Sequence, residues 1–241
     1  MDTQESARNW QASYYGKKGA DRNDLRINRG VLFQVLAWEA SIVRAAYAMQ
    51  HDPQTAKVLD VGCGAGAGIA QLLRLNYSPD NFTGIDVLPA RIAAARRLYP
   101  QINLIHGDAC CLDVANDTFD LVFESTMFAV VTDDDLSMRL AREMVRVCKP
   151  DGYLLLVDWR IPNPRDPGYR ALTKRRLSAL FGLGKQTHRV GTYRGALVPP
   201  LGRLLSKWFP AGYFLVAAVF PFLVWQVAHL LRKNSLLASK G

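Results

Sequence analysis

The chain has 241 residues and 49% hydrophobic content, which is enough for one globular domain with additional segments but too short for two large ones. Its net charge of +9 is uneven, because residues 160–241 hold 14 of the 30 Lys and Arg residues but one of the 21 Asp and Glu residues. Such a basic segment suits contact with phosphate, anionic lipid or nucleic acid, or equally forms a solvated surface. Residues 1–8 lack the apolar core of a secretory signal, so we expect a cytoplasmic protein.

The first 50 residues are interpreted as an N-terminal cap segment, 1–50. Residues 31–49 carry apolar side chains at helical spacing, which predicts a helix with one apolar face. Such a segment can lie over a ligand crevice. Tyr14 and Tyr15 precede this helix, and either pack within the cap or contact the ligand.

A run of apolar residues, Val58–Val61, leads into a loop that contains Gly62, Gly64, Gly66 and Gly68. This pattern is typical of a buried strand that turns sharply into a helix. Glycine allows close approach of the backbone to a ligand, and the free N–H groups at the helix start point towards it. We therefore expect a nucleotide-like ligand, although dinucleotide-binding folds use a similar loop.

The next two predicted strands each lead to an acidic side chain. Residues 81–87 contain Asp86, about 24 positions after Gly62, which suits capture of a ribose diol. Residues 102–105 are followed by Asp108, which could accept a hydrogen bond from an adenine amino group.

Two further predicted strands, 119–123 and 153–157, are followed by Glu124 and Asp158. Strands that alternate with helices predict a parallel sheet with helices on both faces and ligands at the carboxyl ends of its strands. The acids after the strands therefore share one rim. The helices are expected at 66–75, 89–98 and 134–147.

The C-terminal part is predicted to contain a basic helix over 169–181 and a strand over 188–194. No formal charge occurs in 208–231 when His229 is neutral, a length that could span a bilayer. Prolines and polar side chains within this stretch argue against a spanning helix. We expect an internal helix followed by a last buried strand over 224–233, and the alternative is membrane contact by part of 209–222.

From about Lys57 to Arg160 the series resembles the class I S-adenosylmethionine-dependent methyltransferases. The resemblance implies a Rossmann-like, seven-stranded, mostly parallel α/β sheet, with 51–160 as the S-adenosylmethionine-binding core and 161–241 completing the sheet. Asp151 stands where the family often has glycine, and Lys-Pro-Asp-Gly still makes a sound turn. The motifs that carry the resemblance are Val58–Gly66, Gly84-Ile85-Asp86, Gly107-Asp108-Ala109, Phe119–Ser125 and Arg142–Gly152.

The resemblance also implies which residues bind S-adenosylmethionine. Asp60 and the Gly62–Gly66 loop would hold the methionine part, Asp86 the ribose, and Glu124 would lie beside the methionine end. Asp108 and Ala109 would frame the adenine. The full set of predicted cofactor-binding residues is Asp60, Gly62, Cys63, Gly64, Gly66, Asp86, Val87, Asp108, Ala109 and Glu124.

Methyl transfer from a sulfonium is an in-line displacement that depends mainly on positioning, and a hydroxyl acceptor also needs a base. Asp158 is the predicted catalytic base. The alternatives are that Asp158 caps the following loop or pairs with Arg160, and that Glu124 is the base. No cluster of Asp, Glu and His has spacing that requires a divalent metal, and the four cysteines show no metal-ligand spacing, so no metal is expected.

A further combination resembles a subgroup of methyltransferases often met in bacterial polysaccharide and secondary-metabolite pathways: Glu143–Val147, Asp158-Trp159-Arg160 followed by Asn163-Pro164, and Leu197–Pro200 with Arg203. This predicts O-methylation of a small molecule, such as a sugar, a glycan intermediate, a lipid-linked precursor or a secondary metabolite. A phosphorylated acceptor would explain the basic segment 160–241. Peripheral contact of the protein with the inner face of an anionic membrane would explain it equally.

Three other classes stay open at this point. A nucleic-acid methyltransferase would use the basic third as a backbone track, but Glu124-Ser125-Thr126-Met127 stands where an Asn-Pro-Pro-Tyr type motif would lie, and no RNA-binding module is recognisable. A dinucleotide-dependent oxidoreductase is disfavoured by Gly107-Asp108-Ala109. The third class is a noncatalytic, membrane-associated binding protein.

Overall fold

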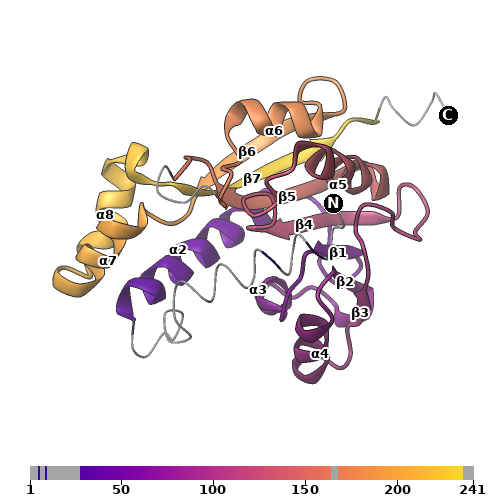
Figure 1. Ribbon diagram of the computed structural model, residues 1–241, viewed down its shortest axis with the longest axis horizontal. Helices are drawn as coiled ribbons and strands as arrows, with labels where there is room; N and C mark the ends of the chain where they lie inside the picture. The colour runs from indigo at the N-terminus through magenta and orange to yellow at the C-terminus, as the bar shows by residue number, and fades with distance from the viewer. Residues whose placement is uncertain (1–4, 6–8, 10–27, 164–167, 236–241) are drawn as a thin grey trace.

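The computed structural model describes residues 28–163 and 168–235, together with Glu5 and Asn9. Seven strands of the described residues form one sheet in the order β3-β2-β1-β4-β5-β7-β6 (Figure 1). The first five strands along the chain are parallel to one another, and β7 is antiparallel to both β5 and β6. The predicted α/β fold is confirmed. The strands are β1 Val58–Val61, β2 Phe82–Asp86, β3 Asn103–His106, β4 Phe119–Ser125, β5 Cys148–Trp159, β6 Thr187–Arg194 and β7 Gln226–Lys233.

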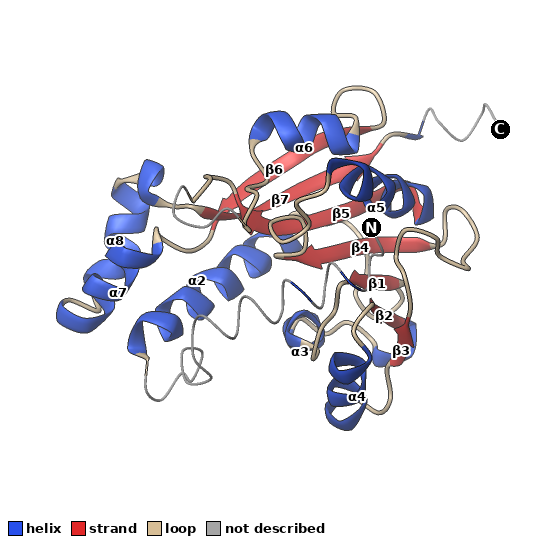
Figure 2. Ribbon diagram, viewed as in Figure 1, coloured by secondary structure: helices blue, strands red, loops and turns tan. Residues whose placement is uncertain are grey.

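Helices cover both faces of the sheet (Figure 2). On one face, α2 Arg29–Ala46, α3 Ala67–Arg74 and α4 Pro89–Leu98 pack on side chains such as Val58 and Phe123. On the other face, α5 Asp134–Val147 and α6 Lys174–Phe181 pack on alternate side chains such as Leu59 and Val122. Successive strand residues point to opposite faces, so these continuous apolar strands are buried on both sides.

Local signals explain the helix boundaries that agree with the sequence. Pro89 occupies the first turn of α4, where its missing N–H costs nothing. Asp133 is the N-cap of α5, because its Oδ1 accepts a hydrogen bond from Leu136 N at 2.7 Å. The prediction that α6 begins at residue 169 was wrong. Thr173 caps this helix by accepting from Arg176 N, so the helix begins at Lys174.

The strand β5 also differs from expectation at its beginning. It was predicted to follow a turn at residues 149–152, but it already begins at Cys148. Asp151 lies within it at a φ of 61°, and the register with β4 shifts between Phe119 and Leu121. Between the pairs Phe119–Cys148 and Leu121–Tyr153, β5 has three more residues than β4, so the predicted turn residues form an irregularity within the strand.

The uncharged stretch 208–231 folds into several short elements. The stretch starts at the last residue of α7 Pro199–Trp208. It then forms α8 Gly212–Val219 and the 3₁₀ helix η3 Pro221–Leu223, and it continues into β7. Among the described residues no helix is long and apolar enough to cross a bilayer. The last strand begins at Gln226, two residues later than predicted. Lys233 fixes its end, because Nζ donates to Asp117 Oδ1 at 2.6 Å and to Cys148 O at 2.7 Å.

Candidate cofactor-binding and active site

The glycine loop after β1 has a backbone that only glycine adopts easily. Gly62, Gly64 and Gly66 have φ values of 71°, 56° and 93°, all in the left-handed region. A Cβ on Gly66 would also lie 2.5 Å from the Tyr99 ring. Gly62 N and Cys63 N both donate to Ile85 O, at 2.8 and 3.0 Å, which ties the loop to the end of β2.

Asp86, predicted to hold a ribose, lies at the end of β2 and is half-buried. Its Oδ2 accepts from Gly64 N at 2.9 Å and its Oδ1 accepts from Leu88 N at 2.8 Å. Each oxygen has a second lone pair that a hydroxyl could use. The structure thus shows Asp86 fixing the glycine loop, and its ribose role stays a prediction.

Asp108 and Ala109 follow β3 at the same edge. Asp108 is exposed, and its Oδ1 accepts from Cys110 N at 2.9 Å in a local turn. His106 Nε2 lies 3.2 Å from Val87 O, so the ends of β2 and β3 are joined. The predicted adenine-framing residues therefore lie next to the predicted ribose residue.

Three acids at the carboxyl ends of neighbouring parallel strands are buried: Asp60 on β1, Glu124 on β4 and Asp158 on β5. The β1–β4 register pairs Val61 with Glu124, so Asp60 and Glu124 come from adjacent strands. Asp60 Oδ2 and Glu124 Oε1 have no hydrogen-bond partner among the described residues. Buried carboxylate oxygens without partners are costly, so they mark a place where a ligand fits.

The pKa values of all three acids are raised. Burial, with the nearby Asp86 carboxylate as a second cause, raises the pKa of Asp60 to about 8. Burial and then the Asp158 carboxylate raise the pKa of Glu124 well above its usual range. Burial raises the pKa of Asp158 to about 7, although hydrogen bonds from backbone N–H groups oppose this. A cation bound here would favour the ionised acids.

Asp158 holds the loop that follows β4. Its Oδ2 accepts from Ala129 N at 2.8 Å and its Oδ1 accepts from Trp159 N at 2.6 Å. The alternative pairing with Arg160 is not observed, because Arg160 Nε donates to Val224 O at 2.7 Å. Asp158 thus fastens the loop after β4, and not the loop after β5 that the capping alternative named; its catalytic role stays a prediction.

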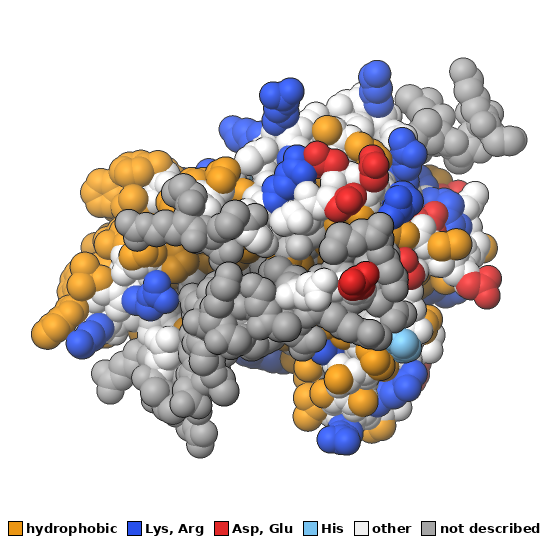
Figure 3. All heavy atoms as spheres, in the orientation of Figure 1, with side chains coloured by type: hydrophobic (Ala, Val, Ile, Leu, Met, Phe, Trp, Pro, Cys, Tyr) orange, Lys and Arg blue, Asp and Glu red, His pale blue; other side chains and the backbone are white. Residues whose placement is uncertain are grey.

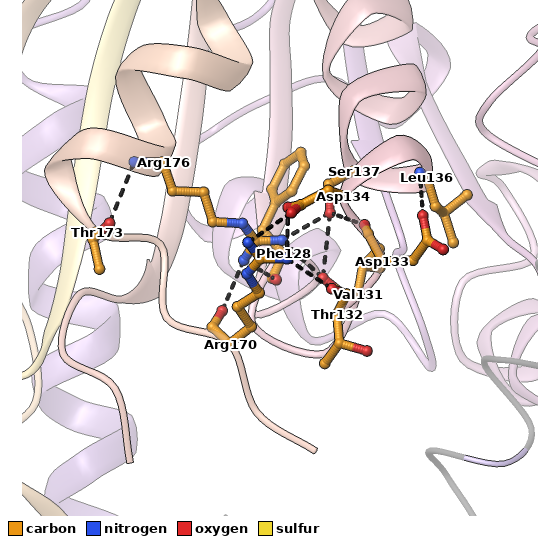
Figure 4. A network of polar contacts seen from close by, with 10 residues as sticks. All are labelled: Phe128, Val131, Thr132, Asp133, Asp134, Leu136, Ser137, Arg170, Thr173 and Arg176. Atoms are coloured by element: carbon orange, nitrogen blue, oxygen red, sulfur yellow. Dashed lines mark hydrogen bonds and ion pairs between the residues drawn. The ribbon is translucent and has the colours of Figure 1, made fainter. Parts of the chain in front are cut away.

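Arg176 on α6 is a central residue that the sequence reasoning missed. Its guanidinium donates to the carbonyl oxygens of Phe128, Val131 and Arg170 and to Ser137 Oγ, at 2.7 to 2.8 Å (Figure 4). It thereby joins α6 to the loop between β4 and α5. Burial lowers the pKa of Arg176, and the nearby Asp158 and Glu124 charges oppose this. Only the three-dimensional fold places it here, since Phe128 precedes it by 48 residues.

α2 lies beside the same edge, and the role of 1–50 as a cap over the ligand stays a prediction. Trp38 Nε1 donates to Ser125 Oγ at 3.0 Å, directly after Glu124. Gln71 Nε2 of α3 donates to Glu39 Oε1 at 2.6 Å, so α2 is also tied to the helix that follows the glycine loop. Tyr14 and Tyr15 lie outside the described residues. Trp38 fell within the predicted helix, but no sequence signal distinguished it from a packing residue.

Comparisons with known proteins agree with this geometry. A family model described as a methyltransferase domain matches residues 58–152. The phthiotriol/phenolphthiotriol dimycocerosates methyltransferase 1 of Mycobacterium ulcerans is 30% identical over 176 residues, which are 65% of this chain and 64% of that protein. The fatty-acid O-methyltransferase of Mycolicibacterium smegmatis is 32% identical over 47% of this chain and 40% of its own length. The chain thus spans less than two thirds of these curated relatives.

A solved structure shows the same fold over nearly the whole chain. The N-methyltransferase NodS from Bradyrhizobium japonicum, in complex with S-adenosyl-L-homocysteine, superposes with a TM-score of 0.65 and covers 95% of this chain and 98% of its own. Its sequence identity is 16%, so it supports the fold alone. With the strand order and the glycine loop, the family match identifies residues 58–152 as a methyltransferase domain, and it supports the resemblance to the class I S-adenosylmethionine-dependent methyltransferases.

Proposed function

We propose that this protein transfers a methyl group from S-adenosylmethionine to a hydroxyl or carboxyl oxygen of a lipophilic acceptor. The observation that carries the proposal is the row of buried acids beside the glycine loop, in which Asp60 Oδ2 and Glu124 Oε1 have no partner among the described residues. α2 borders this row of acids, because Trp38 of α2 donates a hydrogen bond to Ser125 of β4.

The residues present fit a cationic nucleoside cofactor. S-adenosylmethionine supplies a methyl group on a positively charged sulfur and also carries an ammonium group. Burial raises the pKa values of Asp60 and Glu124, and a neighbouring cation would offset the cost of ionising them. Asp86 holds the glycine loop through Gly64 N, and its remaining lone pairs suit hydroxyl donors.

The nature of the acceptor is supported by the relatives. Their names specify a fatty acid, phthiotriol-type lipids and, in Synechocystis, 2-methyl-6-phytyl-1,4-hydroquinone. Among the acceptors considered from the sequence, these favour the lipid-linked class over a free sugar. An oxygen acceptor in such a molecule needs a base when it is a hydroxyl.

Asp158 remains the proposed base, because burial brings its pKa to about 7, where it can take and release a proton near neutral pH. Both of its oxygens already accept backbone N–H groups. Glu124 is the second candidate, since its Oε1 is free of such bonds among the described residues. Asp158→Asn and Glu124→Gln therefore test the two assignments against each other.

The test combines donor binding with transfer to fractionated extracts. Titration calorimetry with S-adenosylmethionine and S-adenosyl-L-homocysteine should show binding, and Asp60→Asn should weaken it. Radiolabelled methyl groups should enter the lipid fraction in preference to the glycan, small-molecule and nucleic-acid fractions. Asp158→Asn should keep donor binding and lower the transfer rate if Asp158 is the base. Failure of the folded protein to bind either nucleoside contradicts the proposal.

A further inference from the structure

A large apolar surface lies outside the proposed site, on the segment formed by α7, α8 and η3. Figure 3 shows hydrophobic side chains gathered over α7 and α8 at one end of the molecule. We call this surface the apolar platform. Most exposed large hydrophobic side chains of the described residues belong to it: Leu204, Trp208, Phe209, Phe214, Leu215, Val219, Phe220 and Phe222.

The inner side of the platform is already packed. Tyr213 of α8 is fully buried, and its hydroxyl oxygen accepts from Leu197 N at 3.1 Å. Phe33 of α2 packs against the Tyr213 ring with centroids 5.5 Å apart. The outer side therefore does not belong to the intramolecular core of the described residues. Contiguous exposed apolar surface of this kind marks an interaction site.

The charged residues within the platform and next to it along the chain are all positive. Arg203 and Lys207 of α7 and Arg194 of β6 are exposed, and no acidic residue occurs between 168 and 235. The described residues give none of these three cations an acidic partner. Arg194 Nη1 instead donates to Ala218 O at 2.7 Å, next to the end of α8. Apolar and aromatic side chains bordered by unpaired cations match the interface of an anionic bilayer.

The platform is also connected to the active-site edge. Arg160, two residues after Asp158, donates to Pro221 O at 2.6 Å. Trp159 packs against the cluster that contains Tyr213, on the inner side of α8. α2 contacts both parts, through Trp38 to Ser125 and through Phe33 to Tyr213. A bilayer bound at the platform would thus lie beside the end of β5 that carries Asp158.

From these observations we propose that the apolar platform docks on an anionic lipid bilayer, with Trp208 and Phe222 inserted at the level of the headgroups and Arg203 and Lys207 on lipid phosphates. Trp208 and Phe222 are 72% and 65% exposed. Lys207 Nζ lies 5.1 Å from the centre of the Trp208 ring, so charge and aromatic ring are presented together. The proposal concerns binding and holds whether or not methyl transfer to lipid is found.

The experiment measures sedimentation of the full chain with vesicles, without cofactor. The test variant is Lys207→Glu with Phe222→Ser. The matched control is Arg97→Glu with Leu98→Ser, because Leu98 is exposed at 63% and Arg97 is also exposed, both near the end of α4. The vesicles consist of phosphatidylcholine alone or of phosphatidylcholine with phosphatidylglycerol.

Wild type and control should bind the anionic vesicles and release them as salt rises. The test variant should bind roughly tenfold more weakly, while its affinity for S-adenosyl-L-homocysteine should match that of wild type. The proposal is overturned if wild type does not bind anionic vesicles, or if both double variants bind equally. It is also overturned if sedimentation equilibrium shows a dimer that the test variant abolishes, since the platform would then pair with a second copy.

Discussion

The clearest prediction concerns the cost of keeping Asp60 buried without a cation. In the absence of cofactor, burial raises its pKa to about 8 from 3.8. Between these values the folded state holds a proton that the unfolded state has lost, so stability falls as pH rises from about 4 to about 8. Each pH unit in this window costs about 1.4 kcal/mol, or about 4 kcal/mol between pH 5 and pH 8 as an upper bound.

Asp60→Asn replaces the titratable carboxyl group with an amide in a side chain of nearly the same size. We expect its free energy of unfolding relative to wild type to increase by up to about 4 kcal/mol between pH 5 and pH 8. Urea unfolding followed by circular dichroism at both pH values measures this difference. Ser41→Ala, at a buried hydroxyl, is the control and should shift stability equally at both. If wild type and Asp60→Asn lose stability in parallel over this range, the argument from buried charge is wrong.

Three further predictions follow from the same edge of the sheet. Arg176→Met should lower the free energy of unfolding by about 3 kcal/mol, measured by urea unfolding, because several carbonyl groups lose a charged donor; Arg176→Lys should restore only part of it. Gly66→Ala should abolish cofactor binding in calorimetry, because φ at Gly66 is 93° and Tyr99 occupies the space that a Cβ would need. Gly107→Ala should retain binding, because a Cβ there would lie 3.4 Å from its nearest neighbour, Ile85. S-adenosylmethionine should release protons on binding at pH 6 to 7, seen as a buffer-dependent enthalpy, because its cation lowers the raised pKa values of the buried acids; equal release by the uncharged-sulfur product would contradict this.

The sequence predicted the elements whose signals are local. α4 and α5 agree with prediction at both ends, because Pro89 begins one and Asp133 caps the other. The glycine loop and the acids after the strands could be identified because parallel strands place their carboxyl ends together. The prolines in 208–231 correctly indicated an interrupted segment, but they did not predict that Arg194 and Arg160 donate hydrogen bonds to Ala218 O and Pro221 O around the end of α8.

The contacts within the site could not be predicted in this way. Arg176 binds carbonyl groups up to 48 residues away, and Trp38 binds Ser125 across 87 residues. Such pairs depend on how the helices settle on the sheet, and periodicity carries no information about this. The absence of a hydrogen-bond partner at Asp60 Oδ2 is likewise visible only when the neighbouring chain segments are in place.

The order of the sheet has a consequence for folding during synthesis. Among the described residues β7 comes after all other strands of the sheet, yet it lies between β5 and β6 and forms hydrogen bonds with both. Until Gln226–Lys233 has left the ribosome, β5 has an open edge of unpaired N–H and C=O groups, and β6 has no neighbour. Chains that stop before β7 should therefore aggregate through that edge, even though every residue of the glycine loop has already been made.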